Sequence, residues 1–114
     1  MAQTETTAER VAQNNVTFRK ANEQIGEAAQ QYVPDEAVPF ICECPDTSCT
    51  ELVRLTLPEY EAVRAYPTHF INAPGHHAAA AGWAQVVEPR DGYDIVEKVG
   101  RAGRIAEDLD PRSS

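Results

Sequence analysis

Apolar residues recur every seven positions near the N-terminus, which predicts one long helix over residues 6–32 with a narrow apolar stripe. The stripe consists of Val11, Phe18, Ile25 and Tyr32. Thr6 and Glu9 have the spacing of a capping box, in which each side chain satisfies a free backbone N–H of the first turn. Pro34 disfavours helical geometry at the residue before it, so we expect the helix to stop there.

Three asparagines, Asn14, Asn15 and Asn22, lie along the edge of this stripe, where a core helix would carry leucines. Two interpretations are open. The helix packs on its own domain through a thin apolar contact, or it pairs with a partner and the asparagines set the register.

Alternating apolar positions then predict two strands, at residues 38–42 and 51–55. Pro39 has no N–H to give to a sheet, so the first strand is expected at an edge. Pro45 and Asp46 favour a turn between the strands. The two strands therefore form a hairpin, with the loop over residues 42–49 as its turn.

A short second helix follows, because Thr56 and Glu59 form another capping box and Pro58 is tolerated in a first helical turn. It should end near Ala65, since Pro67 comes two residues later. Its expected buried face consists of Leu57, Tyr60 and Val63. On the outer face we expect an ion pair between Glu61 and Arg64.

The C-terminal half predicts three more strands, at residues 68–72, 84–88 and 93–99, with a hairpin signal at Asp91-Gly92. The alanine run over 78–82 is too short to nucleate a helix and is expected to be a mobile loop. A short helix at 102–109 and a frayed end at 110–114 complete the chain. The fold class is therefore α+β: a long N-terminal helix on a small antiparallel sheet, in a single domain over 1–114 with a core at 37–100.

Composition narrows the class of protein. With 114 residues the chain has room for one domain. Its net charge of −8 argues against nucleic acid or an anionic membrane as a partner, because both carry negative charge. The first residues show neither the basic nor the apolar segment of a signal peptide, so we expect a cytoplasmic protein.

All three cysteines lie within eight residues, in the spacing Cys-x-Cys-x4-Cys at Cys42, Cys44 and Cys49. An odd number of closely spaced cysteines suits a metal site better than a disulfide framework. Zinc takes four ligands in a tetrahedron, so a fourth must come from elsewhere in the chain. His76 is the first choice, because the turn at Pro74-Gly75 can present its imidazole.

Four other side chains remain open as the fourth ligand. They are His77, His69, Glu43 and Asp46. The histidines are adjacent to the first choice or inside a predicted strand, and carboxylates are less suited to a thiolate-rich site.

Two further functions compete with a structural zinc. Oxidation of the thiolates would make a redox switch that releases zinc. Alternatively, a water at the fourth position would make a zinc hydrolase, with Glu43 or His77 as the base. Three thiolates leave zinc a poor Lewis acid, which disfavours the hydrolase.

With these motifs in place, the chain resembles a family of short bacterial proteins, typical of high-GC Gram-positives, that share a CxCx4C…PGH motif. The matching blocks are residues 18–25, 40–44 with Cys49, 55–56, 59–64, Phe70 with 74–76, 86–88, 96–98 and 110–112. The Ala78–Gly82 run departs from the family, which is charged there. The resemblance implies the fold and a zinc site that uses His76 rather than His69 or His77.

The resemblance also draws attention to Arg19, Asn22 and Glu23, because the N-terminal helix matches the family there. It implies that this helix is a docking element, or that Arg19 and Asn22 hydrogen-bond to the sheet.

The sequence therefore predicts a small zinc-binding protein that acts by protein–protein contact, in a regulatory role. The metal ligands are Cys42, Cys44, Cys49 and His76, with no catalytic residue, and the helix over 6–32 is the candidate surface for a protein partner.

Overall fold

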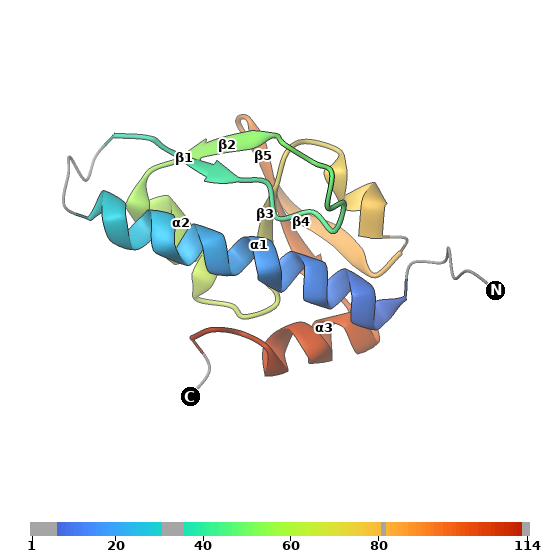
Figure 1. The fold of residues 1–114 in the computed structure, drawn as a ribbon. Helices are drawn as coiled ribbons and strands as arrows, with labels where there is room; N and C mark the ends of the chain where they lie inside the picture. The colour runs from blue at the N-terminus through green and yellow to red at the C-terminus, as the bar shows by residue number, and fades with distance from the viewer. Residues whose placement is uncertain (1–6, 31–35, 81, 113–114) are drawn as a thin grey trace.

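The computed structural model describes residues 7–30, 36–80 and 82–112. This part of the chain forms three α-helices, five strands and one 3-10 helix, η1 (Figure 1). The elements are α1 (Ala8–Ala29), β1 (Val38–Ile41), β2 (Leu52–Leu55), α2 (Leu57–Arg64), β3 (His69–Asn72), η1 (His76–Ala80), β4 (Ala84–Arg90), β5 (Tyr93–Lys98) and α3 (Gly100–Asp108). This is the predicted α+β class.

Helix α1 is shorter than predicted. Its N-cap is Thr7 rather than Thr6: the Thr7 side chain accepts a hydrogen bond from the N–H of Arg10 at 3.1 Å. The helix ends at Ala29. The expected cap at Thr6, the last stripe position at Tyr32 and the stop at Pro34 lie outside the described residues.

The buried face of α1 also differs from the predicted stripe. Phe18 and Ile25 are only half-buried, whereas Asn15, Arg19 and Asn22 have no exposed surface. These polar residues continue a face on which the apolar members are Ala8, Val11, Ala12 and Val16. A face that mixes apolar and polar residues is invisible to a search for hydrophobic periodicity, which explains the error.

The predicted hairpin is confirmed. Strands β1 and β2 pair antiparallel, with Phe40 opposite Val53, and form a sheet of two strands. Helix α2 follows with its capping box intact: Glu59 N–H donates to Thr56, and the Glu59 carboxylate accepts from Thr56 N–H. Tyr60 of this helix stacks on Phe40, with the ring centroids 4.3 Å apart, and so fixes α2 against the hairpin.

The other strands make a second sheet rather than an extension of the first. Its order is β3-β5-β4, and both pairings are antiparallel. The turn between β4 and β5 is at Asp91-Gly92, as predicted, and Gly92 has the positive φ of 91° that such a turn requires. Strand β4 extends to Arg90, two residues beyond the prediction, with a bulge between Val86 and Glu88.

Two predictions for the C-terminal half are wrong. Residues 78–80 of the expected loop belong instead to η1 (His76–Ala80), in which Ala80 is fully buried, and residue 81 lies outside the described residues. The segment 110–112 is held by ion pairs instead of being frayed: Asp110 lies 2.6 Å from Arg64, and Arg112 lies 2.6 Å from Glu23. Residues 113–114 lie outside the described part of the chain.

The predicted surface pair between Glu61 and Arg64 is also wrong. Arg64 is buried and bridges Glu23 and Asp110, while Glu61 pairs with Arg112 at 2.8 Å. Burial of the guanidinium allows it to join α1, α2 and the C-terminal segment.

Helix α1 runs between the β1–β2 hairpin on one side and α3 on the other, with the three-stranded sheet behind it (Figure 1). The loop that follows β1 lies against α1, and the turn that follows β3 meets this loop. No helix in the described ranges is long and apolar enough to cross a membrane.

Candidate metal centre

The cysteine loop continues the hairpin and then turns back on itself. One residue beyond β1, Cys42 N–H donates to the carbonyl of Glu51 at 3.1 Å. The carboxylate of Asp46 then accepts from the N–H and hydroxyl of Ser48, and Cys49 N–H donates to the Asp46 carbonyl at 3.0 Å. Such a turn is what an aspartate followed by small polar residues favours. It returns Cys49 to the side of Cys42.

The turn after β3 brings His76 to the same place. His76 N–H donates to the carbonyl of Ala73 at 3.0 Å, which closes the turn. Gly75 has a positive φ of 82°, a conformation that side chains disfavour. Its N–H donates to Asp94 of β5 at 3.2 Å, so the turn is anchored on the neighbouring strand.

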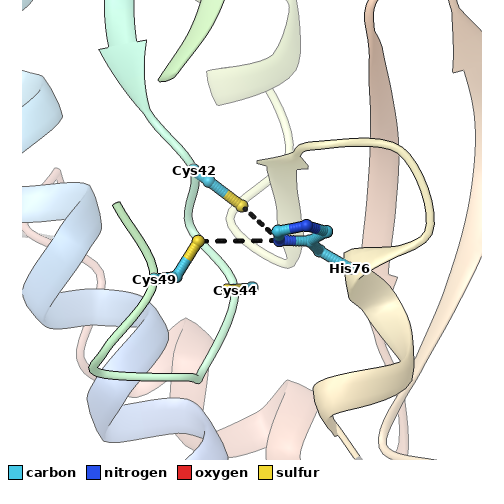
Figure 2. A group of neighbouring side chains, drawn as sticks. All are labelled: Cys42, Cys44, Cys49 and His76. Carbon is cyan, nitrogen blue, oxygen red and sulfur yellow. Dashed lines mark hydrogen bonds between the residues drawn. The ribbon is translucent and has the colours of Figure 1, made fainter. Parts of the chain in front are cut away.

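The four predicted ligands converge. The sulfurs of Cys42, Cys44 and Cys49 and a ring nitrogen of His76 all lie within 4.8 Å of one another. Nδ1 of His76 is 3.6 Å from Sγ of Cys42 and 3.6 Å from Sγ of Cys49, as Figure 2 shows. Sulfurs that share one tetrahedral zinc are about 3.8 Å apart, from a Zn–S bond of about 2.3 Å. The cluster therefore has the donor set and nearly the size of a Cys3His zinc site.

The alternative histidines lie outside this cluster. The His69 ring is tilted against the Tyr66 ring with centroids 4.6 Å apart, and its Nε2 is 3.9 Å from Glu97. His77 lies in η1 next to His76 but does not contribute to the cluster. The structure thus brings His76, and neither of the other two, to the cysteines.

The alternative carboxylates are engaged elsewhere. The Glu43 oxygens accept from Asn22 Nδ2 at 2.9 Å and from Ile71 N–H at 3.0 Å. Asp46 is used by the turn that reverses the cysteine loop, and hydrogen bonds from Ser48 lower the pKa of its carboxyl group.

Hydrogen bonds within the cluster favour thiolate character. The N–H of Ala73 donates to Sγ of Cys42 at 3.2 Å, a contact that favours the charged sulfur. Hydrogen bonds from Cys42 and then from His76 lower the pKa of Cys44 to about 5, even though burial raises it. The pKa of Cys42 is raised in turn, first because its thiol donates to Cys44 and second by burial. The cluster thus stabilises a thiolate, the form that binds metal.

Beyond the option that Arg19 and Asn22 hydrogen-bond to the sheet, sequence reasoning did not predict the buried polar shell beneath these ligands. Glu43, between two of the cysteines, is fully buried, and Arg19 Nε lies 4.0 Å from its carboxylate. Arg19 also donates to the carbonyl of Pro67 at 2.7 Å and lies over the ring of Phe70, 3.6 Å from its centroid. Asn22 hydrogen-bonds to β1, as one of the two options predicts, whereas Arg19 donates to the turn before β3. The docking option stays a prediction.

A signal for this shell was present in the sequence. Counting from Val11 by helical steps of four, four and three residues reaches Asn15, Arg19 and Asn22. The three polar residues therefore lie on the same face of the helix as the apolar Val11.

Comparison with known proteins adds no assignment. The chain matches no protein-family model, and neither a curated protein nor a solved structure shows significant similarity to it. The resemblance to short bacterial proteins with a CxCx4C…PGH motif stays a prediction.

Proposed function

We propose that this chain is a zinc-binding protein in which one Zn²⁺ joins the cysteine hairpin to the turn after β3. The observation that carries the proposal is the convergence of three cysteines and His76, with ligand atoms within 4.8 Å of one another. These side chains come from two parts of the chain separated by β2, α2 and β3. Such a meeting of soft donors is the arrangement of a structural zinc site.

The donor set favours zinc among the common metals. Thiolates bind zinc and copper(I) strongly and bind magnesium or calcium poorly. Three thiolates with one imidazole also match a recurrent structural zinc set.

Four protein donors would complete the tetrahedron. A catalytic zinc keeps one position for water or substrate. The cluster therefore supports a structural role, and the carboxylate of Glu43, engaged with Asn22 and Ile71, offers little as a general base.

We extend the proposal to a regulatory role through contact with another protein. Its net charge of −8 would favour a basic partner surface. The exposed face of α1, with residues such as Gln13, Thr17 and Gln24, is polar and offers hydrogen bonds rather than apolar area.

Metal analysis of the purified full chain tests the zinc proposal. We expect one equivalent of zinc for the unmodified chain and for two control variants, His69→Ala and His77→Ala. His76→Ala and Cys49→Ser should each bind zinc at least tenfold more weakly. Well under one equivalent in the unmodified chain, or equal loss in the His69 control, would refute the assignment.

A redox switch is the second candidate function, favoured by the half-exposed Cys49 beside two buried cysteines. Hydrogen peroxide would take two electrons from two thiolates, which join as a disulfide, while two protons and the peroxide give two waters. Zinc would be released because two of its thiolate ligands are lost to the disulfide. Peroxide titration with a zinc-sensitive dye tests this: release of zinc in step with thiol loss supports it, and retained zinc rules it out.

A further inference from the structure

Helix α1 contacts the ligand-bearing segment through side-chain amides. Oδ1 of Asn22 accepts from the N–H of Ile41 at 2.8 Å, and Nδ2 of Asn22 donates to the carbonyl of the same residue at 2.8 Å. Ile41 directly precedes Cys42. A side-chain amide thus pairs with the backbone as a neighbouring strand would. This pairing fixes the backbone directly before Cys42, the first of the four clustered side chains.

Two more asparagines continue the contact. Nδ2 of Asn15 donates to the carbonyl of Glu43, between the first two cysteines. Nδ2 of Asn14 donates to the carbonyl of Pro45 at 2.8 Å, directly after Cys44. Together with Asn22, these side chains reach the carbonyls before, between and after Cys42 and Cys44. One face of one helix therefore follows the whole segment.

The side chain of Glu43 ties the same segment to β3. Its Oε1 accepts from Ile71 N–H at 3.0 Å, and its Oε2 accepts from Asn22 at 2.9 Å. The backbone N–H of Glu43 donates to the Ile71 carbonyl at 2.8 Å. Because this carboxylate is buried, each lost partner would leave a polar atom without a hydrogen bond, which disfavours the arrangement.

The geometry that zinc requires explains why such anchoring matters. Residues two apart on a straight strand are about 6.6 Å apart, whereas two sulfurs on one zinc are about 3.8 Å apart. The segment over 42–44 must therefore leave strand geometry. A chain held in that conformation before the metal arrives loses less conformational entropy on binding.

We propose that Asn22, Asn15 and Glu43 are positioning residues of the metal centre, which raise its affinity by holding the Cys42–Cys44 segment ready for the metal. The proposal rests on the proposed zinc site. Groups that orient metal ligands without touching the metal typically change metal affinity by about 10–100-fold.

The test measures Zn²⁺ affinity of the full chain by competition with a chromophoric chelator. Asn22→Ala should bind zinc about 10–100-fold more weakly than the unmodified chain. Glu43→Gln, which keeps size but can satisfy only one of its two partners, should weaken binding in the same direction by a smaller factor. With Co²⁺ as a probe, the ligand-to-metal absorption of both variants should keep its wavelength, since the four ligands are unchanged.

Val11→Ala is the matched control. It removes volume from the fully buried Val11 on the same helix, which packs with Ala102 of α3 and with Ala80 at the far end of η1 rather than with the Cys42–Cys44 segment. It should lower stability to denaturant while zinc affinity stays within about threefold, near the limit of such titrations. If Asn22→Ala does not fold, the zinc affinity of Glu43→Gln decides the test.

Each outcome has one meaning. Unchanged zinc affinity in Asn22→Ala and Glu43→Gln overturns the positioning role while the zinc site stands. Equal weakening in Val11→Ala also overturns it, because the effect would then follow general stability. Absence of zinc binding in the unmodified chain refutes the proposed function itself.

Discussion

Helix α1 makes two buried contacts of opposite chemistry. Near its N-terminus Ala8 and Val11 pack with Ala102 of α3, and we name this the apolar contact. Further along, Asn15, Arg19 and Asn22 meet the 41–45 segment and β3, and we name this the polar contact. Both are free of solvent on the helix side.

The difference lies in what each contact specifies. Apolar packing is non-directional and scales with area, at about 25 cal/mol per Å², so it tolerates small shifts of α1 against α3. Hydrogen bonds to named backbone atoms do not tolerate such shifts, since an unsatisfied buried group costs about 1–3 kcal/mol. The polar contact therefore holds the backbone that carries Cys42 and Cys44 in a defined position on the helix.

Removal of the metal should have the largest effect, and it should affect the polar contact before the apolar one. A structural zinc contributes about 10–16 kcal/mol at neutral pH in small zinc domains, comparable to the whole stability of a domain. We expect chelation to lower Tm by at least about 20 °C, and hydrogen exchange to rise first in residues 41–45, before α3. Calorimetry and exchange mass spectrometry measure these changes. An unchanged Tm after the chelator has removed the zinc would contradict the expectation.

Gly103→Ala tests the steric limit of α3, the partner in the apolar contact. A Cβ there would lie 2.6 Å from the carbonyl oxygen of Lys98, a backbone atom that cannot turn away. Although alanine favours a helix, overpacking should dominate and lower the free energy of unfolding by about 1–3 kcal/mol in urea titration. Zinc affinity should not change. A stability gain would show that α3 shifts freely.

Lys98→Met tests the charge beneath the polar contact. The ammonium of Lys98 is buried, 4.7 Å from the Phe70 centroid, and desolvation lowers its pKa to about 7 although Glu43, Cys44 and Cys42 raise it. Between about pH 7 and 10 the unfolded chain then binds more protons at Lys98 than the folded chain, so stability rises with pH.

The slope from this one group is at most about 1.4 kcal/mol per pH unit. We expect the difference in unfolding free energy between the unmodified chain and Lys98→Met to increase in favour of the unmodified chain over that range, as chemical denaturation at stepwise pH would show. A difference independent of pH would mean that Lys98 stays charged in the fold.

Gly26→Ala should have the smallest effect, with the opposite sign to Gly103→Ala. A Cβ at Gly26 would be 3.7 Å from the Tyr60 ring and 3.8 Å from Phe40, an ordinary contact distance. Helix propensity should therefore raise stability by about 1 kcal/mol. Thermal unfolding checks this, and a loss of stability would show that α1 packs more tightly against α2 than described.

Local signals made most of the secondary structure predictable. The Thr56–Glu59 capping box, the Asp91-Gly92 turn and the alternation in the hairpin act over a few residues, and each prediction is confirmed. The meeting of the four side chains was also predictable, because the three cysteines lie within eight residues and only the histidine is distant.

Features set by distant partners were not predictable. Whether Asn22 is buried depends on its hydrogen bond to the backbone of Ile41. Whether the C-terminal segment is ordered depends on the ion pairs of Asp110 with Arg64 and of Arg112 with Glu23. Hydrophobic periodicity carries no information on such pairs. The division into two sheets, rather than the single one predicted, has the same origin.

X-ray absorption at the zinc edge of the purified chain tests the central claim most directly. The Cys3His centre predicts three sulfurs at about 2.3 Å and one nitrogen at about 2.0 Å around a single zinc. His76→Ala should lose the nitrogen, and His69→Ala should keep it. A shell with fewer than three sulfurs in the unmodified chain, or no bound zinc to measure, would contradict the claim.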